Sequence, residues 1–229
     1  MYPTPRQMQR GELPLPTTLS YVQFTEERLR RTVLPARYLR RRRVAEIAAI
    51  VLSSPVIIPV ILLIALAVRI DSPGPVFFFQ ERVGYQGARF RMIKLRSMRA
   101  GTGGGSLLTG LHDRRITRLG RLLRQYHLDE LPQLWNVLVG EMSLIGPRPE
   151  AAVLAERFEQ NIPLYHYRRI VPCGMTGWGQ VNMGYAADIE STRLKLCYDL
   201  DYVTNISLRL DLKILYQTVF AVLTRYGSR

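Results

Sequence analysis

The longest apolar stretch of the chain runs from Ile47 to Val68, 22 residues without a charged side chain. A helix of that length spans roughly 33 Å, which suffices for a hydrocarbon core of about 30 Å. A cleaved signal peptide is disfavoured because both this stretch and the chain before it are too long for one, although an Ala-Leu-Ala tripeptide near its end resembles a cleavage site. The pattern therefore predicts that residues 44–70 insert into a membrane.

Proline interrupts the pattern of this segment. Pro55 removes a backbone donor and clashes with the preceding turn, which predicts a break or kink at Ser54-Pro55, where the serine hydroxyl can satisfy a freed carbonyl. The two halves, 47–54 and 56–68, reach only about 12 Å and 20 Å. Both flanks are basic, so a spanning helix would export one of them against the positive-inside tendency. We expect a re-entrant helix-break-helix that enters and leaves by the cytoplasmic face, with a kinked spanning helix as the alternative.

Basic and polar residues dominate the chain before this segment. The first 43 residues contain ten arginines and three glutamates, a local charge of +7, and end in four consecutive arginines, Arg40 to Arg43. Such a segment is either a solvated tail or an arm on anionic headgroups, where each basic residue contributes about 1 kcal/mol. We expect residues 1–43 to form a flexible or interfacial arm.

After the membrane segment the chain has the pattern of a soluble domain, residues 71–229, which the re-entrant topology would place on the cytoplasmic side. Two strand-like segments, 76–83 and 88–95, flank a Gly-Tyr-Gln-Gly turn and predict a β-hairpin. Lys94 and Arg96 would share one face of the second strand. The predicted fold class is α+β and mainly helical: a re-entrant membrane helix-break-helix plus a cytoplasmic globular domain with a small β-hairpin and surface amphipathic helices.

Three further segments have helical periodicity. Residues 113–127 combine an apolar stripe with a face of arginines, and residues 208–229 are amphipathic, suited to the core or to a membrane surface. Between them, Asp129 would cap a helix that has Pro132 in its first turn. The apolar face of that helix would consist of Leu131, Leu134, Trp135, Leu138 and Val139.

Composition narrows the choice of partner. The net charge of +14, from 32 Lys and Arg against 18 Asp and Glu, favours an anionic partner: nucleic acid, anionic lipid or a phosphorylated small molecule. Two cysteines, Cys173 and Cys197, give no disulfide framework and favour a reducing compartment. The three histidines lack metal-ligand spacing. The glycine-rich stretch 101–110 lacks the Lys-Ser/Thr ending of a phosphate loop, so we expect a flexible loop.

Two adjacent acids, Asp129 and Glu130, stand between arginines in this basic chain. Taken alone, they are best explained as a helix start. However, Arg124 precedes them, and the two prolines of a Gly-Pro-Arg-Pro turn hold Arg148 rigidly after them. A fixed guanidinium suits bidentate phosphate binding. The carboxylates would repel a phosphate unless a divalent cation bridged them, as Mg²⁺ does.

These features occur within a longer set of motifs. In order along residues 43–225 the chain contains SSPVIIPV, RIDSPGPVFFFQERVG, FRMIKLRSM, DRRITRLGRLLR, LDELPQLWNVLVGEMSLIGPRP, MTGWGQVN and SLRLDLKIL. With these motifs the sequence resembles the bacterial sugar transferases, the monotopic polyprenyl-phosphate sugar-1-phosphate (phosphoglycosyl) transferases. The acidic motif followed by GPRP is the most specific part of the resemblance.

The resemblance implies an enzyme with Mg²⁺ as cofactor. An aspartate attacks the phosphate that bears the sugar of a nucleotide-diphosphate sugar, nucleoside monophosphate leaves, and undecaprenyl phosphate then takes the sugar phosphate. The implied site residues are Asp129 as nucleophile and metal ligand, Glu130 as metal ligand or base, Lys94, Arg124 and Arg148 as phosphate-binding residues, Thr176, Gly177 and Gln180 as a nucleotide or sugar loop, and Ser54-Pro55 as the break of the membrane helix.

The resemblance also implies a setting. The substrates would be a nucleotide-diphosphate sugar, with UDP as the expected nucleotide, and undecaprenyl phosphate, at the cytoplasmic face of the bacterial inner membrane and in contact with its lipid. The product would start exopolysaccharide, capsule, O-antigen or glycoprotein glycan assembly. The sequence leaves open whether the protein forms a homodimer. The sugar is not determined by the sequence.

Two other functions compete with this one. A membrane-tethered nucleic-acid-binding protein would explain the charge, but the chain has no standard binding motif and does not interleave basic with aromatic residues, so no nucleic-acid partner is expected. A non-catalytic scaffold of the same fold is disfavoured by the intact acidic pair. Three positions depart from the family pattern: Glu46 replaces an aspartate, Pro172-Cys173 replaces a basic residue and proline, and Asp201 replaces a tyrosine.

Overall fold

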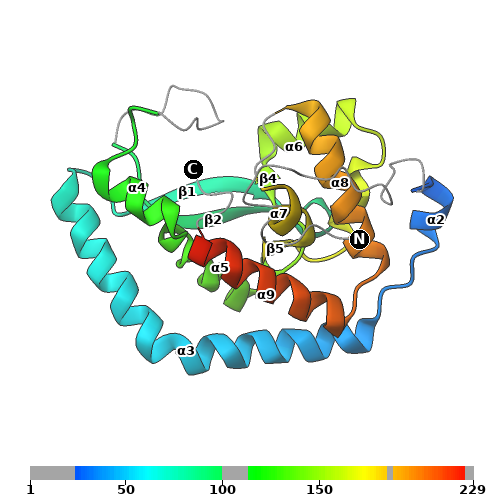
Figure 1. Ribbon diagram of the computed structural model, residues 1–229, viewed down its shortest axis with the longest axis horizontal. Coiled ribbons are helices and arrows are strands. Elements are labelled where there is room, and N and C mark those ends of the chain that lie inside the picture. Colours follow the sequence, from blue (N-terminus) through cyan, green and yellow to red (C-terminus); the bar gives the residue numbers. More distant parts are fainter. Residues whose placement is uncertain (1–23, 100–112, 185–187, 225–229) are drawn as a thin grey trace.

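Helices make up most of the described chain, which comprises residues 24–99, 113–184 and 188–224 of a computed structural model (Figure 1). The α-helices are α2 (Glu26–Arg30), α3 (Ala36–Asp71), α4 (Arg118–Gln125), α5 (Gln133–Val139), α6 (Ala152–Asn161), α7 (Trp178–Met183), α8 (Ile189–Thr204) and α9 (Leu208–Thr224). The 3₁₀ turns are η2 (Tyr85–Gly87), η3 (Leu128–Glu130) and η4 (Tyr165–Arg169). The strands are β1 (Phe77–Val83), β2 (Arg89–Leu95), β3 (Ser143–Ile145), β4 (Glu150–Ala151) and β5 (Gly174–Thr176).

Two small sheets form the centre of the domain. Strands β1 and β2 form the antiparallel hairpin that the sequence predicted, in a register from Phe77 opposite Leu95 to Val83 opposite Arg89, and β4 adds to the other edge of β1. The second sheet pairs β3 with β5 in parallel. The predicted class, α+β and mainly helical with a small hairpin and one long apolar helix, is confirmed. The predicted loop at residues 101–110 lies outside the described residues.

The long helix α3 continues through both of its prolines. Because Pro55 has no N–H, the carbonyl of Val51 loses its usual helical donor. The hydroxyl of Ser54 donates to that carbonyl at 2.7 Å, as the sequence suggested. The helix axis turns midway along its length (Figure 1). The helix is therefore kinked at Ser54-Pro55 but is not divided into the separate halves 47–54 and 56–68. It stays continuous because the Ser54 side chain replaces the missing backbone donor.

The first turns of α3 are part of the domain rather than of the arm. The helix begins at Ala36, so the run Arg40 to Arg43 is helical. Arg42 donates to Tyr202 Oη at 2.6 Å and to Asp211 Oδ2 at 3.1 Å, which ties α3 to α8 and α9. Its side chain is 9% exposed. The sequence pattern assigned this arginine to the arm because a buried, paired arginine and a solvated one look the same in sequence.

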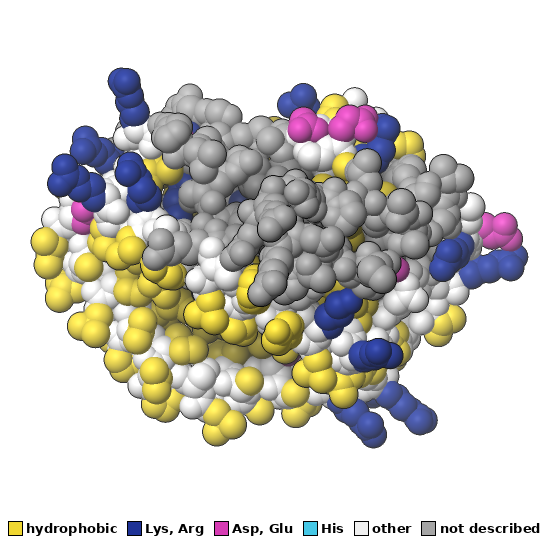
Figure 2. All heavy atoms as spheres, in the orientation of Figure 1, with side chains coloured by type: hydrophobic (Ala, Val, Ile, Leu, Met, Phe, Trp, Pro, Cys, Tyr) yellow, Lys and Arg dark blue, Asp and Glu magenta, His cyan; other side chains and the backbone are white. Residues whose placement is uncertain are grey.

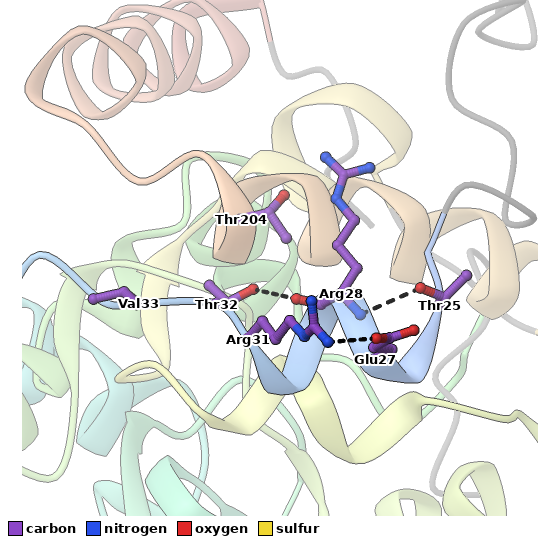
Figure 3. Close-up of a pocket in the computed structure, with 7 residues that line it drawn as sticks. All are labelled: Thr25, Glu27, Arg28, Arg31, Thr32, Val33 and Thr204. Carbon is purple, nitrogen blue, oxygen red and sulfur yellow. Dashed lines mark hydrogen bonds and ion pairs between the residues drawn. The ribbon is translucent and has the colours of Figure 1, made fainter.

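A short helix, α2, precedes α3. The hydroxyl of Thr25 accepts a hydrogen bond from the backbone N–H of Arg28 and caps it, and Arg31 pairs with Glu27 (Figure 3). Leu29 is buried against the domain. Together with Thr204 at the end of α8, this region lines a surface pocket of about 560 Å³. The lining includes neither carboxylate of the acidic pair.

Exposed apolar side chains gather on two helices. By length and composition, α3 is the one helix among the described residues that could cross a membrane, and its apolar window is almost entirely exposed. The face in Figure 2 is apolar along the edge that α3 forms. Helix α9 also exposes large apolar side chains. Because soluble proteins seldom expose contiguous apolar surface of this kind, the surface suits contact with lipid. The exposed residues of α9 are Leu208, Leu212, Leu215, Tyr216, Val219 and Leu223.

The predicted apolar face of α5 packs on the core only in part: Leu134 and Leu138 contact a core cluster, and the rest of the face does not. Trp135 is 60% exposed and Val139 is 51% exposed, whereas Gln133 and Asn136 are buried. The amide of Asn136 accepts from the N–H of Ile93 at 3.1 Å and donates to a carbonyl of the same strand, so this polar side chain completes the edge of β2. Hydrogen bonding to the sheet, together with the buried Val137, determines which face of α5 turns inward.

Candidate active site

The acidic pair lies in the connection between α4 and α5. Asp129 and Glu130 belong to the turn η3, and α5 begins only at Gln133 with Pro132 at its N-cap, so the expected N-cap role of Asp129 is wrong. His127 precedes the turn in the left-handed region, with φ 55°, and its carbonyl accepts from the N–H of Glu130 at 3.1 Å. The side chains of the acids are therefore not used for helix capping.

Helix α4 approaches the segment after β2 closely. A Cβ atom at Gly120 would stand 2.0 Å from the carbonyl oxygen of Ser97, so only glycine permits this approach. One turn later, Arg124 donates from Nε to Ser97 Oγ at 2.7 Å. Among the described residues no hydrogen bond joins Arg124 to Asp129, and the two interact through charge alone.

Glu130 receives two cations on one oxygen. Its Oε1 accepts from Lys94 Nζ at 2.7 Å and from Arg148 Nη2. Burial alone would raise the pKa of Glu130, but the charges of Arg148 and Lys94 outweigh it and hold the pKa well below its ordinary value. Glu130 is thus an ionised carboxylate whose charge is already balanced.

Asp129 has the opposite environment. It is 6% exposed, and within the described part of the chain its carboxylate makes neither a hydrogen bond nor an ion pair. Burial raises the pKa of Asp129, while the nearby charge of Lys94 opposes the rise. Two neighbouring carboxyl groups with pKa values displaced in opposite directions indicate two different roles. Among the described residues, Asp129 is the member of the pair whose oxygens no cation contacts.

The turn Gly146 to Pro149 fixes Arg148. The N–H of Gly146 donates to Thr176 O at 2.9 Å, and the carbonyl of Pro147 accepts from Gly174 N at 3.0 Å. A Cβ atom at Gly146 would lie 2.2 Å from a backbone oxygen, so the turn packs against β5 without room for a side chain. This packing directs Arg148 toward Glu130. The sequence predicts the acidic pair and the Gly-Pro-Arg-Pro turn in one site.

The predicted nucleotide or sugar loop lies behind Arg148. The carbonyl of Met175 accepts from Arg148 Nη1 and from Gln180 Nε2, each at 3.0 Å. Thr176 shares a hydrogen bond of 2.6 Å with Thr218 of α9, and Gly177 packs on the carbonyl of Gly146. The sequence suggested a loop at these residues, but the structure has strand β5 followed by helix α7 there. A contact with nucleotide or sugar stays a prediction.

The site offers few ligands for a metal ion. In residues 24–99, 113–184 and 188–224 no group of three or more His, Cys, Asp or Glu side chains is arranged to hold one. Asp129 keeps both of its oxygens, and Glu130 keeps Oε2, outside the hydrogen bonds described above. Because Mg²⁺ is commonly held by one or two carboxylates together with substrate phosphates, these residues fit a shared Mg²⁺ site, not an all-protein one.

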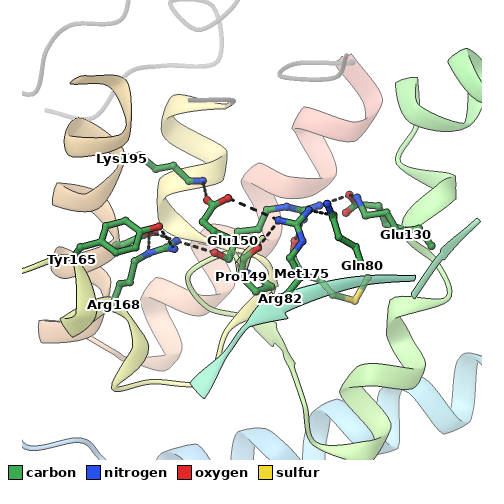
Figure 4. A network of polar contacts seen from close by, with 12 residues as sticks. Gln80, Arg82, Glu130, Pro149, Glu150, Tyr165, Arg168, Met175 and Lys195 are labelled. Carbon is green, nitrogen blue, oxygen red and sulfur yellow. Dashed lines mark hydrogen bonds and ion pairs between the residues drawn. The ribbon is translucent and has the colours of Figure 1, made fainter. Parts of the chain in front are cut away.

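Buried charges behind the turn were missed by sequence reasoning. Arg168 pairs with Asp199 at 2.7 Å. Lys195 pairs with Glu150 at 3.0 Å (Figure 4). Glu150 directly follows the Gly-Pro-Arg-Pro motif, which is the only signal in the sequence that could have pointed to this network.

The three departures from the family pattern have local partners. Glu46 accepts from Ser143 Oγ at 2.5 Å and from the N–H of Leu144 at 3.2 Å. Cys173 is buried in an apolar cluster, and burial raises the pKa of its thiol to about 12. Asp201 accepts from the indole N–H of Trp178 at 3.1 Å. None of these groups touches the acidic pair.

Fold and site together define a class of protein: a long apolar helix joined to a domain that brings two unequal carboxylates and two basic side chains to one place. The family model described as bacterial sugar transferase matches residues 37–225. The chain belongs to this family.

Several curated relatives have assigned names. The chain is 44% identical over 189 residues to the UDP-N-acetylgalactosamine-undecaprenyl-phosphate N-acetylgalactosaminephosphotransferase of Aeromonas hydrophila, covering 82% of this chain and 45% of the relative. It is 45% identical over 169 residues to the UDP-glucose:undecaprenyl-phosphate glucose-1-phosphate transferase of Xanthomonas campestris, covering 72% and 35%. A protein of the latter name from Caulobacter vibrioides is 42% identical over 187 residues, covering 80% and 70%. The chain thus spans less than half of the first two relatives.

Proposed function

We propose that this protein transfers a sugar-1-phosphate from a UDP-sugar to undecaprenyl phosphate through a phosphosugar-aspartyl intermediate. The observation that carries the proposal is the inequality of the acidic pair. Glu130 is held by two cations, whereas Asp129 is buried, has no hydrogen-bond partner in the described part of the chain and interacts with the charges of Lys94 and Arg124. The names of the relatives supply the class of donor and acceptor.

The first half-reaction forms a bond between Asp129 and phosphorus. A carboxylate oxygen attacks the phosphorus that bears the sugar, and the bond from that phosphorus to the oxygen of nucleoside monophosphate breaks, so the monophosphate leaves with the electron pair. In the second half-reaction a phosphate oxygen of undecaprenyl phosphate attacks the same phosphorus and the bond to Asp129 breaks. Covalent catalysis of this type divides one difficult transfer into two easier ones.

Basic side chains offset the charge that develops during both transfers. Arg148 presents a planar fork suited to phosphate oxygens, and Lys94 adds a compact charge beside it. Arg124, whose charge acts on Asp129, would offset charge near the attacking oxygen. Mg²⁺, held by Asp129 and Glu130 together with the substrate phosphates, would neutralise negative charge on the diphosphate.

The proposed location is the cytoplasmic face of the bacterial inner membrane, with α3 as a re-entrant helix. The kink, and the basic residues before and after the apolar stretch, support this arrangement because a spanning helix would export one basic flank. Cysteines introduced at positions 20 and 228, in a chain without Cys173 and Cys197, should both be shielded from an impermeant thiol reagent in intact cells. Labelling at position 20 alone would contradict the re-entrant topology.

The covalent step can be tested without the acceptor lipid. Purified protein with Mg²⁺ and the correct UDP-sugar should release about one equivalent of UMP in a burst. The mass of the protein should rise by one sugar phosphate, on the peptide that contains Asp129. A screen of UDP-sugars by the same assay identifies the sugar.

Two variants make this test specific. Asp129→Asn keeps the shape of the side chain but is a far poorer nucleophile, so it should abolish both the burst and the mass increase. Asp188→Asn is the matched control, because this exposed residue caps α8 and asparagine is an equally good cap. Direct transfer predicts the opposite pattern: no UMP until polyprenyl phosphate is added, and no labelled peptide from an active enzyme.

A further inference from the structure

We infer that Arg168 is a positioning residue that acts on the substrate phosphates through the backbone of Arg148. Arg168 lies behind the Gly-Pro-Arg-Pro turn, and its Nη2 donates to the carbonyl oxygen of Arg148 at 2.8 Å (Figure 4). The inference rests on the proposed function, in which the side chain of Arg148 contacts phosphate. In this inference Arg168, which lies outside the acidic pair, fixes the position at which Arg148 contacts the phosphate.

The guanidinium of Arg168 is itself held on all sides. It is 5% exposed. Nε and Nη2 donate to Asp199 Oδ2 at 2.9 and 2.7 Å, and Nη1 donates to Tyr165 Oη at 3.1 Å. Asp199 and Tyr165 are each 2% exposed. Such a fully engaged side chain has little freedom, so the carbonyl of Arg148 is bound to a fixed point of the domain.

The same turn is clamped at the next peptide. Arg82 donates from Nη1 to the carbonyl of Pro149 at 3.0 Å. The buried Arg168 and the half-buried Arg82 thus hold two successive carbonyls, those of Arg148 and Pro149. Strand β5 holds the N-terminal side of the turn through Gly146 and Pro147. The backbone around Arg148 is therefore fixed in both directions along the chain.

Stability alone does not explain a buried arginine at this place. Desolvation of a buried ion pair is so costly that apolar residues of similar volume often replace it at no loss of stability. An apolar side chain at position 168 would, however, leave the carbonyl of Arg148 without this donor. A rotation of that peptide would move the guanidinium at the far end of the side chain, and a misplacement of about 1 Å can reduce a rate roughly 100-fold.

The adjacent arginine provides a matched control. Arg169 forms its ion pair with Glu159, and among the described residues it makes no hydrogen bond or ion pair with the turn. Substitution of Arg169 by lysine therefore makes the same chemical change one residue away. Arg168→Lys keeps a positive charge beside Asp199, but one ammonium group cannot reproduce the fork that reaches Asp199, Tyr165 and the Arg148 carbonyl together.

A double-mutant cycle separates positioning from general stability. The rate constant of the UMP burst is measured for the unsubstituted protein, Arg168→Lys, Arg148→Met and the double variant, with melting temperatures of the same samples. Arg168→Lys should slow the burst about 10- to 100-fold, and Arg169→Lys should leave it within about twofold. In the Arg148→Met background, Arg168→Lys should have no further effect, because the residue through which it acts is gone.

Three results would overturn the inference: an unchanged burst in a folded Arg168→Lys protein, equal effects of Arg168→Lys with and without Arg148, or an equal loss in Arg169→Lys. If Arg168→Lys does not fold, Tyr165→Phe replaces it in the cycle. That variant removes one partner of the guanidinium, and it should slow the burst less and only when Arg148 is present.

Failure of the proposed function would look different. The unsubstituted protein would then show no burst, and the cycle is repeated on the dissociation constant for UDP in the presence of Mg²⁺. Weaker binding in Arg168→Lys, abolished in the Arg148→Met background, would support the clamp without the covalent step. Additive losses of affinity, or an affinity unchanged by Arg168→Lys, would overturn it.

Discussion

Replacing Arg148 by lysine tests whether the shape of this cation matters beyond its charge. The guanidinium bridges two acceptors, because Nη1 donates to Met175 O at 3.0 Å and Nη2 pairs with Glu130. A lysine ammonium carries the same charge on one nitrogen and cannot occupy both positions. Turnover should therefore fall although the charge of the site is unchanged.

The contacts set the expected size of the effect. Lysine would still pair with Glu130, and the carbonyl of Met175 would keep its donor from Gln180. We therefore expect a loss of about 1 kcal/mol in the free energy of unfolding, near the net value of one hydrogen bond. Removal of one donor that stabilises transition-state charge costs about 100- to 1,000-fold in rate. Arg148→Met breaks a partly buried ion pair and should cost more stability, about 2–3 kcal/mol, because Glu130 then relies on Lys94 alone.

Rapid-quench measurement of UMP release gives the rate, and melting of the same samples gives the stability. The signature of a bidentate role is a large loss of rate with a small loss of stability in Arg148→Lys. Arg169→Lys controls for the chemical change itself. A near-normal burst in Arg148→Lys would show that charge suffices and would refute the reasoning from geometry.

Three further outcomes follow from the same contacts. Burial alone would raise the pKa of Glu150, but the charges of Lys195, Arg168 and Arg82 together outweigh it and lower the pKa from 4.5 to about 2. The stability from this group, about 3 kcal/mol, should be complete above pH 4.5 and be lost toward pH 2, and Glu150→Gln should flatten melting curves across that range. Asn136→Leu should cost about 2–4 kcal/mol because it strands the N–H of Ile93, whereas Trp135→Leu at the exposed neighbour should cost far less. Removal of Mg²⁺ by EDTA should stop the UMP burst, and added Mg²⁺ should restore it.

Local patterns predicted the elements whose signals are local. The apolar stretch from Ile47 to Val68 lies within one helix, and the turn between two alternating segments produced the hairpin. The rigid turn around Arg148 was predictable because two prolines and a glycine restrict the backbone wherever they occur. The proximity of Arg148 to Glu130 followed from joining two motifs 18 residues apart.

Helix α5 shows why burial could not be read from apolar periodicity. The pattern groups Trp135 and Val139 with Leu134 and Leu138 on one apolar face, but periodicity does not say which part of such a face contacts the protein core. A protein with an exposed apolar helix has lipid as a second candidate environment, and there an apolar face can turn outward. The inward position of Asn136 depends on unpaired backbone groups of β2, which lie some 40 residues earlier in the chain.

The asymmetry of the acidic pair connects binding to catalysis in the proposed reaction. Before substrate arrives, Lys94 and Arg148 already contact the Glu130 carboxylate. A diphosphate that recruits these cations exchanges one charge-assisted contact for another, so they contribute little to binding of the ground state. As negative charge accumulates during attack by Asp129, the exchange becomes more favourable, and only interactions that strengthen in the transition state accelerate the chemical step. Glu130 would thus keep the cations in place while limiting how tightly the substrate is held.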